Sequence, residues 1–286
     1  MTAPPTTMHG DPPPRPRLLA LPGAMLVRAV WQYRGFVWGM VSREFQARYR
    51  YSLLGSAWAV LNPAAMIAIY TVVFSQVMRA RLPGVDDSFA YSIYICAGLL
   101  PWTFFAEVIA RSLSVFFDNA ALLKKVSFPR ISLPVVLLLS STVNFVIIFG
   151  LFLLVLVFTG RFPGWVVMAL APLLVIQQAF ALGLGILFGV LNVFFRDVGQ
   201  LVGVAMQFWF WLTPIVYSAA ILSDRVRAAL AWNPLTRLVG AYQQILVAGT
   251  WPEWSQFRVH AVAAVVVLGL AFIVFDRLSA EMVDEL

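Results

Sequence analysis

The chain has 286 residues, of which 61% are hydrophobic and only 12% are charged. A soluble domain carries about 45–50% apolar and about 25% charged residues, so this composition excludes an ordinary soluble domain and predicts an integral membrane protein. The 20 Lys and Arg residues exceed the 13 Asp and Glu residues. This excess fits basic loops beside membrane spans, and no basic run on a polar scaffold points to nucleic acid.

The first segment, residues 1–27, is rich in proline and polar residues. It cannot bury enough apolar surface to offset the entropy lost on folding, so it is expected to be a disordered tail. It also has no apolar core of the kind that a signal peptide needs.

Residues 28–56 are predicted to contain an amphipathic helix at the membrane surface. Apolar residues recur at Val37, Val41, Phe45 and Tyr49, and arginines fall on the other side of the helix. Such a helix would lie in the membrane interface and lead directly into the first span. The alternative is a basic segment that only contacts anionic lipid.

Six membrane-spanning helices are predicted after this segment, which makes the expected fold an all-α polytopic membrane protein. Each is a mostly apolar run long enough to cross the hydrocarbon core. The predicted spans are 57–78, 89–110, 133–158, 165–195, 201–219 and 257–275. Gly98 and Pro101 are expected to interrupt the second span, and the fourth is long enough to tilt.

Two connecting segments within this transmembrane domain, residues 57–277, have distinct patterns. Residues 111–130 form a predicted loop that carries both lysines of the chain. Residues 222–253 contain two short apolar stretches separated by Trp232-Asn233-Pro234. Neither stretch can span, so they predict a pair of re-entrant helices before the last span. An external loop with one surface helix is the alternative.

The distribution of basic residues predicts the orientation. Thirteen of the twenty Lys and Arg residues fall on the side that holds the N-terminus, the 111–130 loop and the C-terminus. Basic residues beside spans stay inside, so both termini are expected in the cytoplasm, with residues 278–286 as a short cytoplasmic tail.

The sequence lacks the residues of the common catalytic sites. Its two lysines, Lys124 and Lys125, belong to no Gly-Lys-Ser/Thr phosphate-binding loop. Its two histidines, His9 and His260, and its one cysteine, Cys96, offer no catalytic triad and no cluster spaced for a metal. A transport protein without its own enzymatic site or cofactor is therefore predicted.

Six blocks of sequence occur in order along the chain: REFQARYRYSLLGSAWAVLNP, GLLPWTFF, LLKKVSFPR, LNVFFRDVGQLVG, FWFWLTPIVY and NPLTRLVGAYQQIL. Together they resemble the membrane subunit of ABC exporters for bacterial cell-surface polysaccharides, the export permeases for O-antigen, teichoic acid and capsule. The resemblance covers residues 28–277. It implies a homodimer in the inner membrane, with two copies of a separate nucleotide-binding ATPase subunit that binds ATP and Mg. It also implies a polysaccharide linked to undecaprenyl diphosphate as the substrate, passing through a channel between the two copies.

The resemblance also implies that a segment between the second and third spans couples transport to the ATPase. A short helix that stops before a proline could present cations and an aromatic ring to a soluble partner. An ordinary basic loop is the alternative. The residues of this coupling segment are Leu122, Leu123, Lys124, Lys125, Val126, Ser127, Phe128, Pro129 and Arg130.

Three arginines, Arg43, Arg48 and Arg50, are candidates to attract the diphosphate of the lipid carrier. A guanidinium can hold two phosphate oxygens at once, which suits it to this role. Contact with bulk lipid headgroups is an equally good interpretation of each arginine.

An aromatic cluster is predicted near the outer end of the fifth span. Aromatic faces can stack on sugar rings, and Trp and Tyr also gather at any membrane interface. Consecutive residues point around the whole helix, so at most about half of them can face a channel. The cluster consists of Phe208, Trp209, Phe210, Trp211 and Tyr217.

Other polar and small residues lie inside the predicted spans. Glu107 and Arg111, one turn apart, are expected to pair. Gly185 and Gly189, with Gly183 nearby, would allow close contact between helices. Uncharged polar residues are predicted either to line a hydrated path or to bond neighbouring helices; they are Asn144, Gln177, Gln178 and Gln207.

Two other functions remain compatible with these patterns. One is an ABC permease for a drug or a small lipid, which would need no channel wide enough for sugar rings. The other is an ATP-independent secondary transporter, which would need more buried ionisable residues than Glu107 alone provides.

Overall fold

The computed structural model describes residues 34–49, 55–73, 89–125 and 130–286. Within these ranges the ordered elements are all helices, and no residue there belongs to a strand. The all-α prediction is therefore confirmed.

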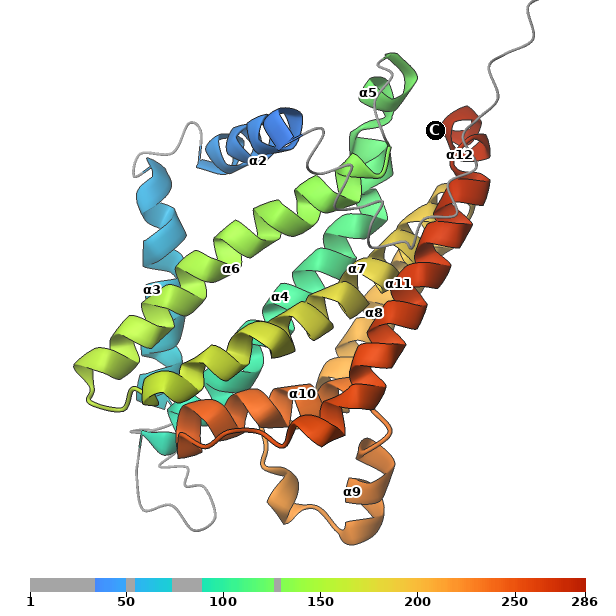
Figure 1. Cartoon of the computed structure of the whole chain (residues 1–286). Coiled ribbons are helices and arrows are strands. Elements are labelled where there is room, and N and C mark those ends of the chain that lie inside the picture. Colours follow the sequence, from blue (N-terminus) through green and yellow to red (C-terminus); the bar gives the residue numbers. More distant parts are fainter. Residues whose placement is uncertain (1–33, 50–54, 74–88, 126–129) are drawn as a thin grey trace, which may run out of the picture.

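Four helices among the described residues are long and apolar enough to cross a membrane. They are α4 (Ala90–Asp118), α6 (Ser132–Phe158), α7 (Leu170–Phe194) with a preceding 3₁₀ turn (Gly164–Ala169), and α11 (Arg258–Leu278) with a preceding 3₁₀ turn (Trp254–Phe257). All four run between the same two ends of the molecule (Figure 1). The chain is a multi-pass membrane protein.

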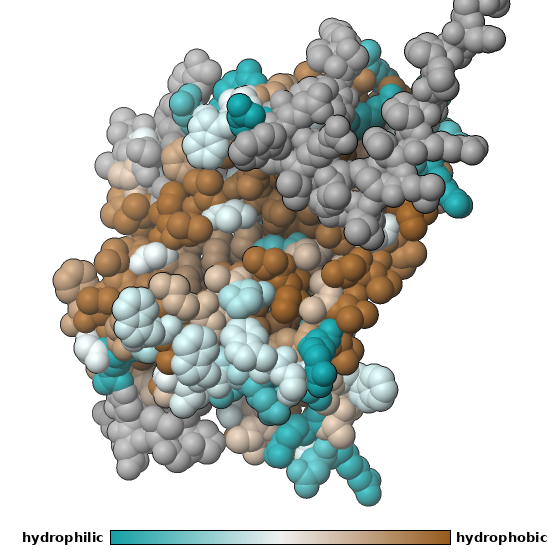
Figure 2. Space-filling view, viewed as in Figure 1, coloured by the Kyte–Doolittle hydropathy of each residue, from teal (hydrophilic) through white to brown (hydrophobic). Residues whose placement is uncertain are grey.

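Shorter helices gather at these two ends (Figure 1). One end, called here the α5 end, holds α2 (Arg34–Tyr49), α5 (Ala120–Lys125) and α12 (Glu281–Glu285). The other, called the α10 end, holds α9 (Asp224–Leu230) and α10 (Pro234–Gln243). Figure 2 shows a broad hydrophobic band between them, with hydrophilic residues toward both ends, as a membrane-embedded protein requires.

The second predicted span is longer and more regular than expected. α4 runs through Gly98 and Pro101 without a break and continues to Asp118 instead of ending at residue 110. Gly98 does not interrupt the helix. It allows α10 to pack closely against α4, because a Cβ at Gly98 would lie only 2.9 Å from Nε2 of Gln243 on α10. An internal proline costs one backbone hydrogen bond, which the packed neighbours of a long helix can offset. Most of the predicted 111–130 loop is accordingly helical.

The fifth predicted span, residues 201–219, is also wrong in its bounds. α8 covers Asp197–Trp211, because Pro214 lacks an N–H group and disfavours helical geometry in the residue before it. Its 15 residues give a length of about 22 Å, short of the hydrocarbon thickness of about 30 Å. α3 (Trp58–Val72) has the same number of residues within the described part of the first predicted span.

Glycines allow α7 to approach two other long helices closely. A Cβ at Gly189 would lie 2.4 Å from the backbone oxygen of Ser112 on α4, and one at Gly183 would lie 2.8 Å from the backbone nitrogen of Leu268 on α11. Gly185 also faces Ser112. The predicted role of these small residues in close helix contact is confirmed.

The two short helices at the α10 end differ in burial. α10 buries one face, including Leu235, Leu238 and Tyr242, whereas α9 has no buried residue. The hydroxyl of Tyr242 donates a 2.6 Å hydrogen bond to Oε1 of Gln177 on α7. The amide of Gln177 in turn donates to the carbonyl of Pro101, at 2.9 Å. α10 is thus fastened to the bundle, and Gln177 bonds neighbouring helices, one of its two predicted roles.

At the α5 end, α2 lies across the outside of α6 (Figure 1). Val37 and Val41 are each 3% exposed and pack with Val136 of α6. Trp38 is 65% exposed and Arg43 is also exposed. Val37 and Val41, two of the four residues of the predicted apolar side, therefore contact the bundle.

Candidate functional site

A cavity of about 680 Å³ lies at the α5 end, between α2 and the adjoining parts of α4, α5 and α6. α2 contributes Arg43 and Glu44, α4 contributes Arg111 and Asp118, and Leu122 comes from α5. The cavity therefore joins one predicted lipid-binding arginine to the predicted coupling segment, two features 79 residues apart in the sequence (from Arg43 to Leu122).

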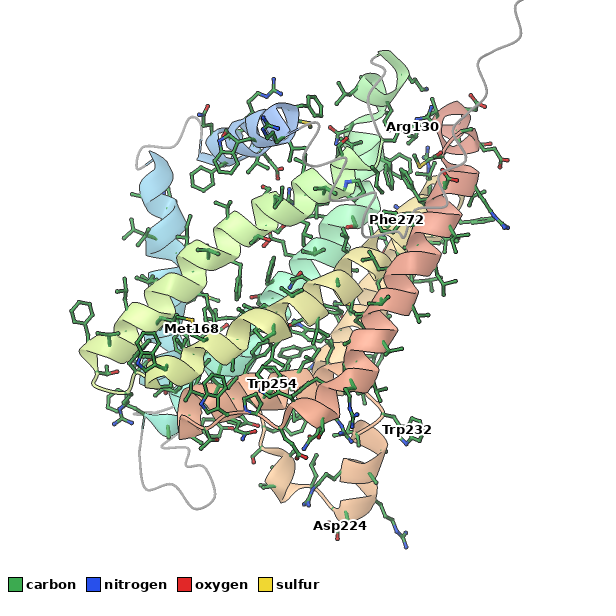
Figure 3. The ribbon with its side chains drawn as sticks, viewed as in Figure 1. Arg130, Met168, Asp224, Trp232, Trp254 and Phe272 are labelled. Atoms are coloured by element: carbon green, nitrogen blue, oxygen red, sulfur yellow. The ribbon has the colours of Figure 1, made fainter. Side chains whose placement is uncertain are left out.

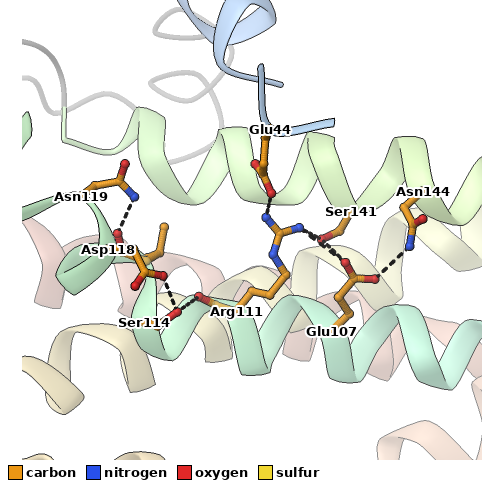
Figure 4. Close-up of polar contacts among 9 residues, drawn as sticks. Glu44, Glu107, Arg111, Ser114, Asp118, Asn119, Ser141 and Asn144 are labelled. Atoms are coloured by element: carbon orange, nitrogen blue, oxygen red, sulfur yellow. Dashed lines mark hydrogen bonds and ion pairs between the residues drawn. The ribbon is translucent and has the colours of Figure 1, made fainter. Parts of the chain in front are cut away.

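A polar network beside this cavity connects three helices (Figure 4). Arg111 of α4 forms an ion pair with Glu44 of α2. It also donates to Oγ of Ser141 on α6 at 2.8 Å, and to Oε1 of Glu107 at 3.4 Å. The amide of Asn144, also on α6, donates to Oε2 of Glu107 at 3.4 Å. The guanidinium of Arg111 thus forms ion pairs with two carboxylates, those of Glu44 and Glu107.

The partial burial of this network gives its charges more weight than an exposed pair would have. The side chains of Arg111 and Glu44 are 26% and 33% exposed, and that of Glu107 is 24% exposed. Water screens such charges less than it screens surface charges, so removing Arg111 would take one shared cation away from both Glu44 and Glu107.

Sequence reasoning found only part of this network. The Glu107–Arg111 pair was predicted from its spacing and is confirmed, with N and O 3.4 Å apart. Glu44 was missed, because its partner is 67 residues further along the chain. The sequence feature that could have identified Glu44 is that it is the only acidic residue of α2.

The coupling segment is partly described. Leu123 is 6% exposed, Leu122 is half-buried and Lys124 is exposed on α5, whose last residue is Lys125. Residues Val126, Ser127, Phe128 and Pro129 lie outside the described residues. Arg130 donates a hydrogen bond to the backbone oxygen of Ser279, just after α11. The segment is therefore joined to the C-terminal part of the chain.

The three predicted phosphate-binding arginines are not all described. Arg43 is exposed, lines the cavity and donates from Nε to the carbonyl of Gly39 at 3.1 Å. Arg48 lies in the last turn of α2, and Arg50 falls outside the described residues. A joint role for the three arginines stays a prediction.

The five predicted channel aromatics do not form one surface. Phe208 and Trp211 are 67% and 64% exposed. Trp209 points into the bundle, where its ring centroid lies 5.5 Å from that of Phe105 and 6.5 Å from that of Trp102. Phe210 also contacts Trp102, with centroids 5.7 Å apart. Tyr217 is half-buried and donates to the carbonyl of Trp211 at 2.8 Å.

Asn233 connects α8 to α10, a structural role that the sequence analysis did not assign to it. Its Oδ1 accepts hydrogen bonds from the indole of Trp209 at 2.9 Å and from the backbone N–H of Leu235 at 3.0 Å. Its amide donates to Oγ1 of Thr213 at 2.9 Å. The sequence feature that could have identified this role is the Asn-Pro dipeptide, which is typical of a helix N-cap followed by proline in the first turn.

A metal centre has no basis in the part of the chain that the structure describes. No group of three or more His, Cys, Asp or Glu side chains there could hold a metal ion.

Comparison with known proteins decides the class of membrane protein. Residues 36–247 match the family model described as "ABC-2 type transporter". The chain belongs to the ABC-2 type transporter family. The matched region starts in α2 and ends in the π-helix (Gln244–Ala248) that follows α10, so it includes the cavity, the polar network and α8.

Several characterised relatives are similar along most of the chain. An O-antigen export system permease protein RfbA from Myxococcus xanthus is 32% identical over 263 residues, which is 91% of this chain and 99% of the relative. An RfbA from Klebsiella pneumoniae is 30% identical over 74% of this chain and 80% of its own length. A polysialic acid transport protein KpsM from Escherichia coli is 23% identical over 80% and 88% of the two chains.

Membership of the ABC-2 family defines the type of protein. The relatives are named as an export permease and a transport protein, and membership of an ABC transporter family implies an ATPase that is a separate subunit. This ABC-2 permease is therefore a transport subunit that works with an ATPase partner, as the sequence predicts.

Proposed function

We propose that this ABC-2 permease exports a lipid-linked cell-surface polysaccharide, of the O-antigen or capsule type, across the bacterial inner membrane. The observation that carries the proposal is the alignment with an O-antigen export permease over 91% of this chain and 99% of that relative. An alignment that includes nearly every residue of both chains favours a shared cargo more strongly than a match to one domain does. The separate ATPase subunit binds ATP and Mg and supplies the energy.

In the proposed assembly, two copies of the chain pair and two ATPase subunits bind beneath them. The exposed face of α8 supports a wet path between the copies. Gln200 and Gln207 are exposed and lie two turns apart, and Phe208 and Trp211 are exposed nearby. Amide groups facing lipid would be costly, whereas facing water or sugar hydroxyls they can form hydrogen bonds. Exposed aromatic rings would offer stacking surfaces to a moving glycan.

The proposed topology has six spans, with the shorter α3 and α8 counted among them. α9 and α10 form a re-entrant pair before the last span, and α10 supports this through its buried face. The α5 end faces the cytoplasm together with both termini, because Lys124 of α5 lies at that end and so do Arg130 and Arg196, in the turns before α6 and α8. The polypeptide keeps the predicted division into a tail (1–27), an interface segment (28–56), a transmembrane domain (57–277) and a second tail (278–286).

The α5 end has two proposed contacts. Lys124 and the rest of the coupling segment bind the ATPase, supported by the exposure of Lys124 on α5. The arginines of α2 attract the undecaprenyl diphosphate of the substrate, supported by the place of Arg43 at the rim of an open cavity. A guanidinium near the membrane surface meets phosphate favourably.

The test is reconstitution of the permease with its ATPase in liposomes that contain a lipid-linked glycan. Glycan should become accessible on the far side of the membrane only when ATP and both subunits are present. Transfer of a drug or a small lipid, with no transfer of the glycan, would assign the chain to a different class of ABC permease. Transfer by the permease alone would contradict the need for an ATPase partner.

A further inference from the structure

A second cavity, of about 450 Å³, lies at the α10 end, far from the coupling segment. It lies between α10 with its π-helix on one side and the segment that leads into α11 on the other. Cavities of about 300–1,000 Å³ are typical of small-ligand sites, so its volume is sufficient for a ring-sized ligand.

The side chains around this cavity suit a carbohydrate. Arg237 and Gln244 come from the α10 side, and Trp251, Glu253 and Gln256 come from the opposite side. Sugar hydroxyls both donate and accept hydrogen bonds, and guanidinium, amide and carboxylate groups provide donors and acceptors for them. Trp251 is 55% exposed, so it has indole surface available to the apolar face of a sugar ring.

Several of these groups are already held in place. Glu253 accepts hydrogen bonds from Nε2 of Gln256 at 2.6 Å and from Oγ of Ser255 at 3.0 Å. These two bonds lower the pKa of Glu253, so its carboxylate is ionised at neutral pH and acts as an acceptor. The amide of Gln244 donates to Oγ1 of Thr250 at 3.1 Å. Groups fixed in this way lose little freedom when a ligand binds.

The helix on one side of the cavity is packed firmly into the bundle, through residues that do not line the cavity themselves. Tyr242 is fully buried and hydrogen-bonded to Gln177, and Ile245 is also fully buried. The chain changes from α-helix to π-helix at Gln244 and turns away at Gly249, which has a φ of 63°. Short π-helical segments recur at functional sites, where they place side chains that a regular helix would direct elsewhere.

Exposed tryptophans also occur elsewhere at this end, as in any interfacial aromatic belt. Trp232 is 90% exposed and points away from the helices (Figure 3), and it is absent from the lining of the cavity. Trp251 differs because four polar or charged side chains line the same cavity. A belt residue needs no such neighbours, whereas a sugar site needs both the ring and the hydrogen-bonding groups.

We propose that this cavity binds a sugar unit of the glycan as it leaves the membrane at the α10 end. The proposal rests on the proposed export function and adds a binding site to it. Bound sugar here would hold the emerging chain between steps of ATP hydrolysis and oppose its return into the membrane.

The test uses the full-length permease in lipid nanodiscs. The probe is the polysaccharide released from its lipid carrier by mild acid and isolated from the strain that makes this permease. Binding is measured by titration calorimetry and by saturation-transfer NMR. The wild-type permease should bind the probe saturably. Trp251→Ala should weaken binding by about tenfold, the loss expected for one aromatic stacking contact. Trp251→Phe keeps a ring and should stay within about threefold of the wild type.

Trp232→Ala is the matched control, because it removes an exposed tryptophan from the same end but not from the cavity. It should leave binding unchanged. Equal binding by the Trp251→Ala and Trp232→Ala variants would overturn the proposal, and so would a wild-type permease that does not bind the probe saturably. ATP-driven transfer in liposomes is scored separately. Normal transfer by a wild-type permease that fails the binding test would reject this site and leave the export function standing.

Discussion

The close approach of α7 and α4 at Gly189 leads to a quantitative prediction. In Gly189→Ala the new Cβ would lie 2.4 Å from the backbone oxygen of Ser112 and 3.2 Å from a ring carbon of Phe116. Ordinary contacts of a Cβ begin at 3.4 Å, so the helices must separate by about 1 Å. The carbonyl belongs to the backbone of α4 and cannot rotate away as a side chain can.

The expected cost follows from this separation. Overpacking a close helix contact costs about 1–3 kcal/mol, and the upper part of that range applies where backbone is the obstacle. A gap of 0.5–1 Å also forfeits about a quarter to a half of the dispersion energy of the neighbouring contacts. Against this loss, replacing glycine by alanine inside a helix stabilises the helix by about 0.5–1 kcal/mol. We therefore expect a net loss of about 2 kcal/mol, which lowers the melting temperature by about 4–8 °C in a chain of this size.

The chain offers a matched control and an intermediate case. Gly150 is in α6, and a Cβ there would have nothing within 4 Å, so Gly150→Ala should be neutral or slightly stabilising. Gly185→Ala should fall between the two. The hydroxyl of Ser112, at 2.4 Å, can rotate away at the expense of its 2.7 Å bond to the backbone oxygen of Val108, but the Cβ of Ser112, at 2.9 Å, still requires a small shift of the helices.

The assay is thermal unfolding of the detergent-solubilised permease, followed by tryptophan fluorescence and by the monodisperse fraction on size exclusion. The predicted order of melting temperatures is Gly150→Ala highest, then Gly185→Ala, then Gly189→Ala. If Gly189→Ala melted at or above the temperature of Gly150→Ala, the close contact between α7 and α4 would be refuted.

Three further predictions follow from the polar contacts and the coupling segment. Glu44→Gln should cost about 1 kcal/mol and Arg111→Ala about 2–3 kcal/mol, because only the second leaves two carboxylates without their cation. A double-mutant cycle on thermal unfolding measures both, and equal losses would contradict the shared cation. Asn233→Ala should lower stability by about 2 kcal/mol in the same assay, since it removes the bonds from Asn233 to Trp209 of α8 and to Thr213 just after α8, and also the N-cap bond to Leu235 of α10; an unchanged melt would argue against that connection. Lys124→Glu combined with Lys125→Glu should reduce co-purification of the ATPase and ATP-dependent export, and full retention of both would remove the proposed coupling role.

Long apolar helices were predictable because the membrane leaves few structural options. Backbone groups in hydrocarbon must bond within their own segment, so an uninterrupted apolar run has to be a helix. The span predicted at 133–158 corresponds to α6, Ser132–Phe158, within one residue. The predicted ends of two helices were wrong because residues outside the apolar run determine where each helix stops. α8 ends at Trp211, ahead of Pro214, whereas α4 continues beyond its apolar run to Asp118.

The candidate site was predictable only in pieces. Spacing within one helix identified the Glu107–Arg111 pair, because residues four apart lie on the same face. Glu44 and Ser141 join Arg111 from α2 and α6, so their place depends on how three helices pack. No local pattern encodes that arrangement.

For the protein as a whole, features set within one segment were predictable, and features set by contacts between segments were not. Composition, apolar runs and ordered motifs by themselves determined a helical membrane protein, its approximate spans and its resemblance to polysaccharide export permeases, because these properties depend on local chemistry and the lipid surroundings. The packing of the helices, which no local pattern encodes, makes Trp209 point inward while Trp211 is exposed, and it brings Trp251 into one cavity with Arg237. Those relations depend on the distances between segments far apart in the chain, and packing alone sets these distances.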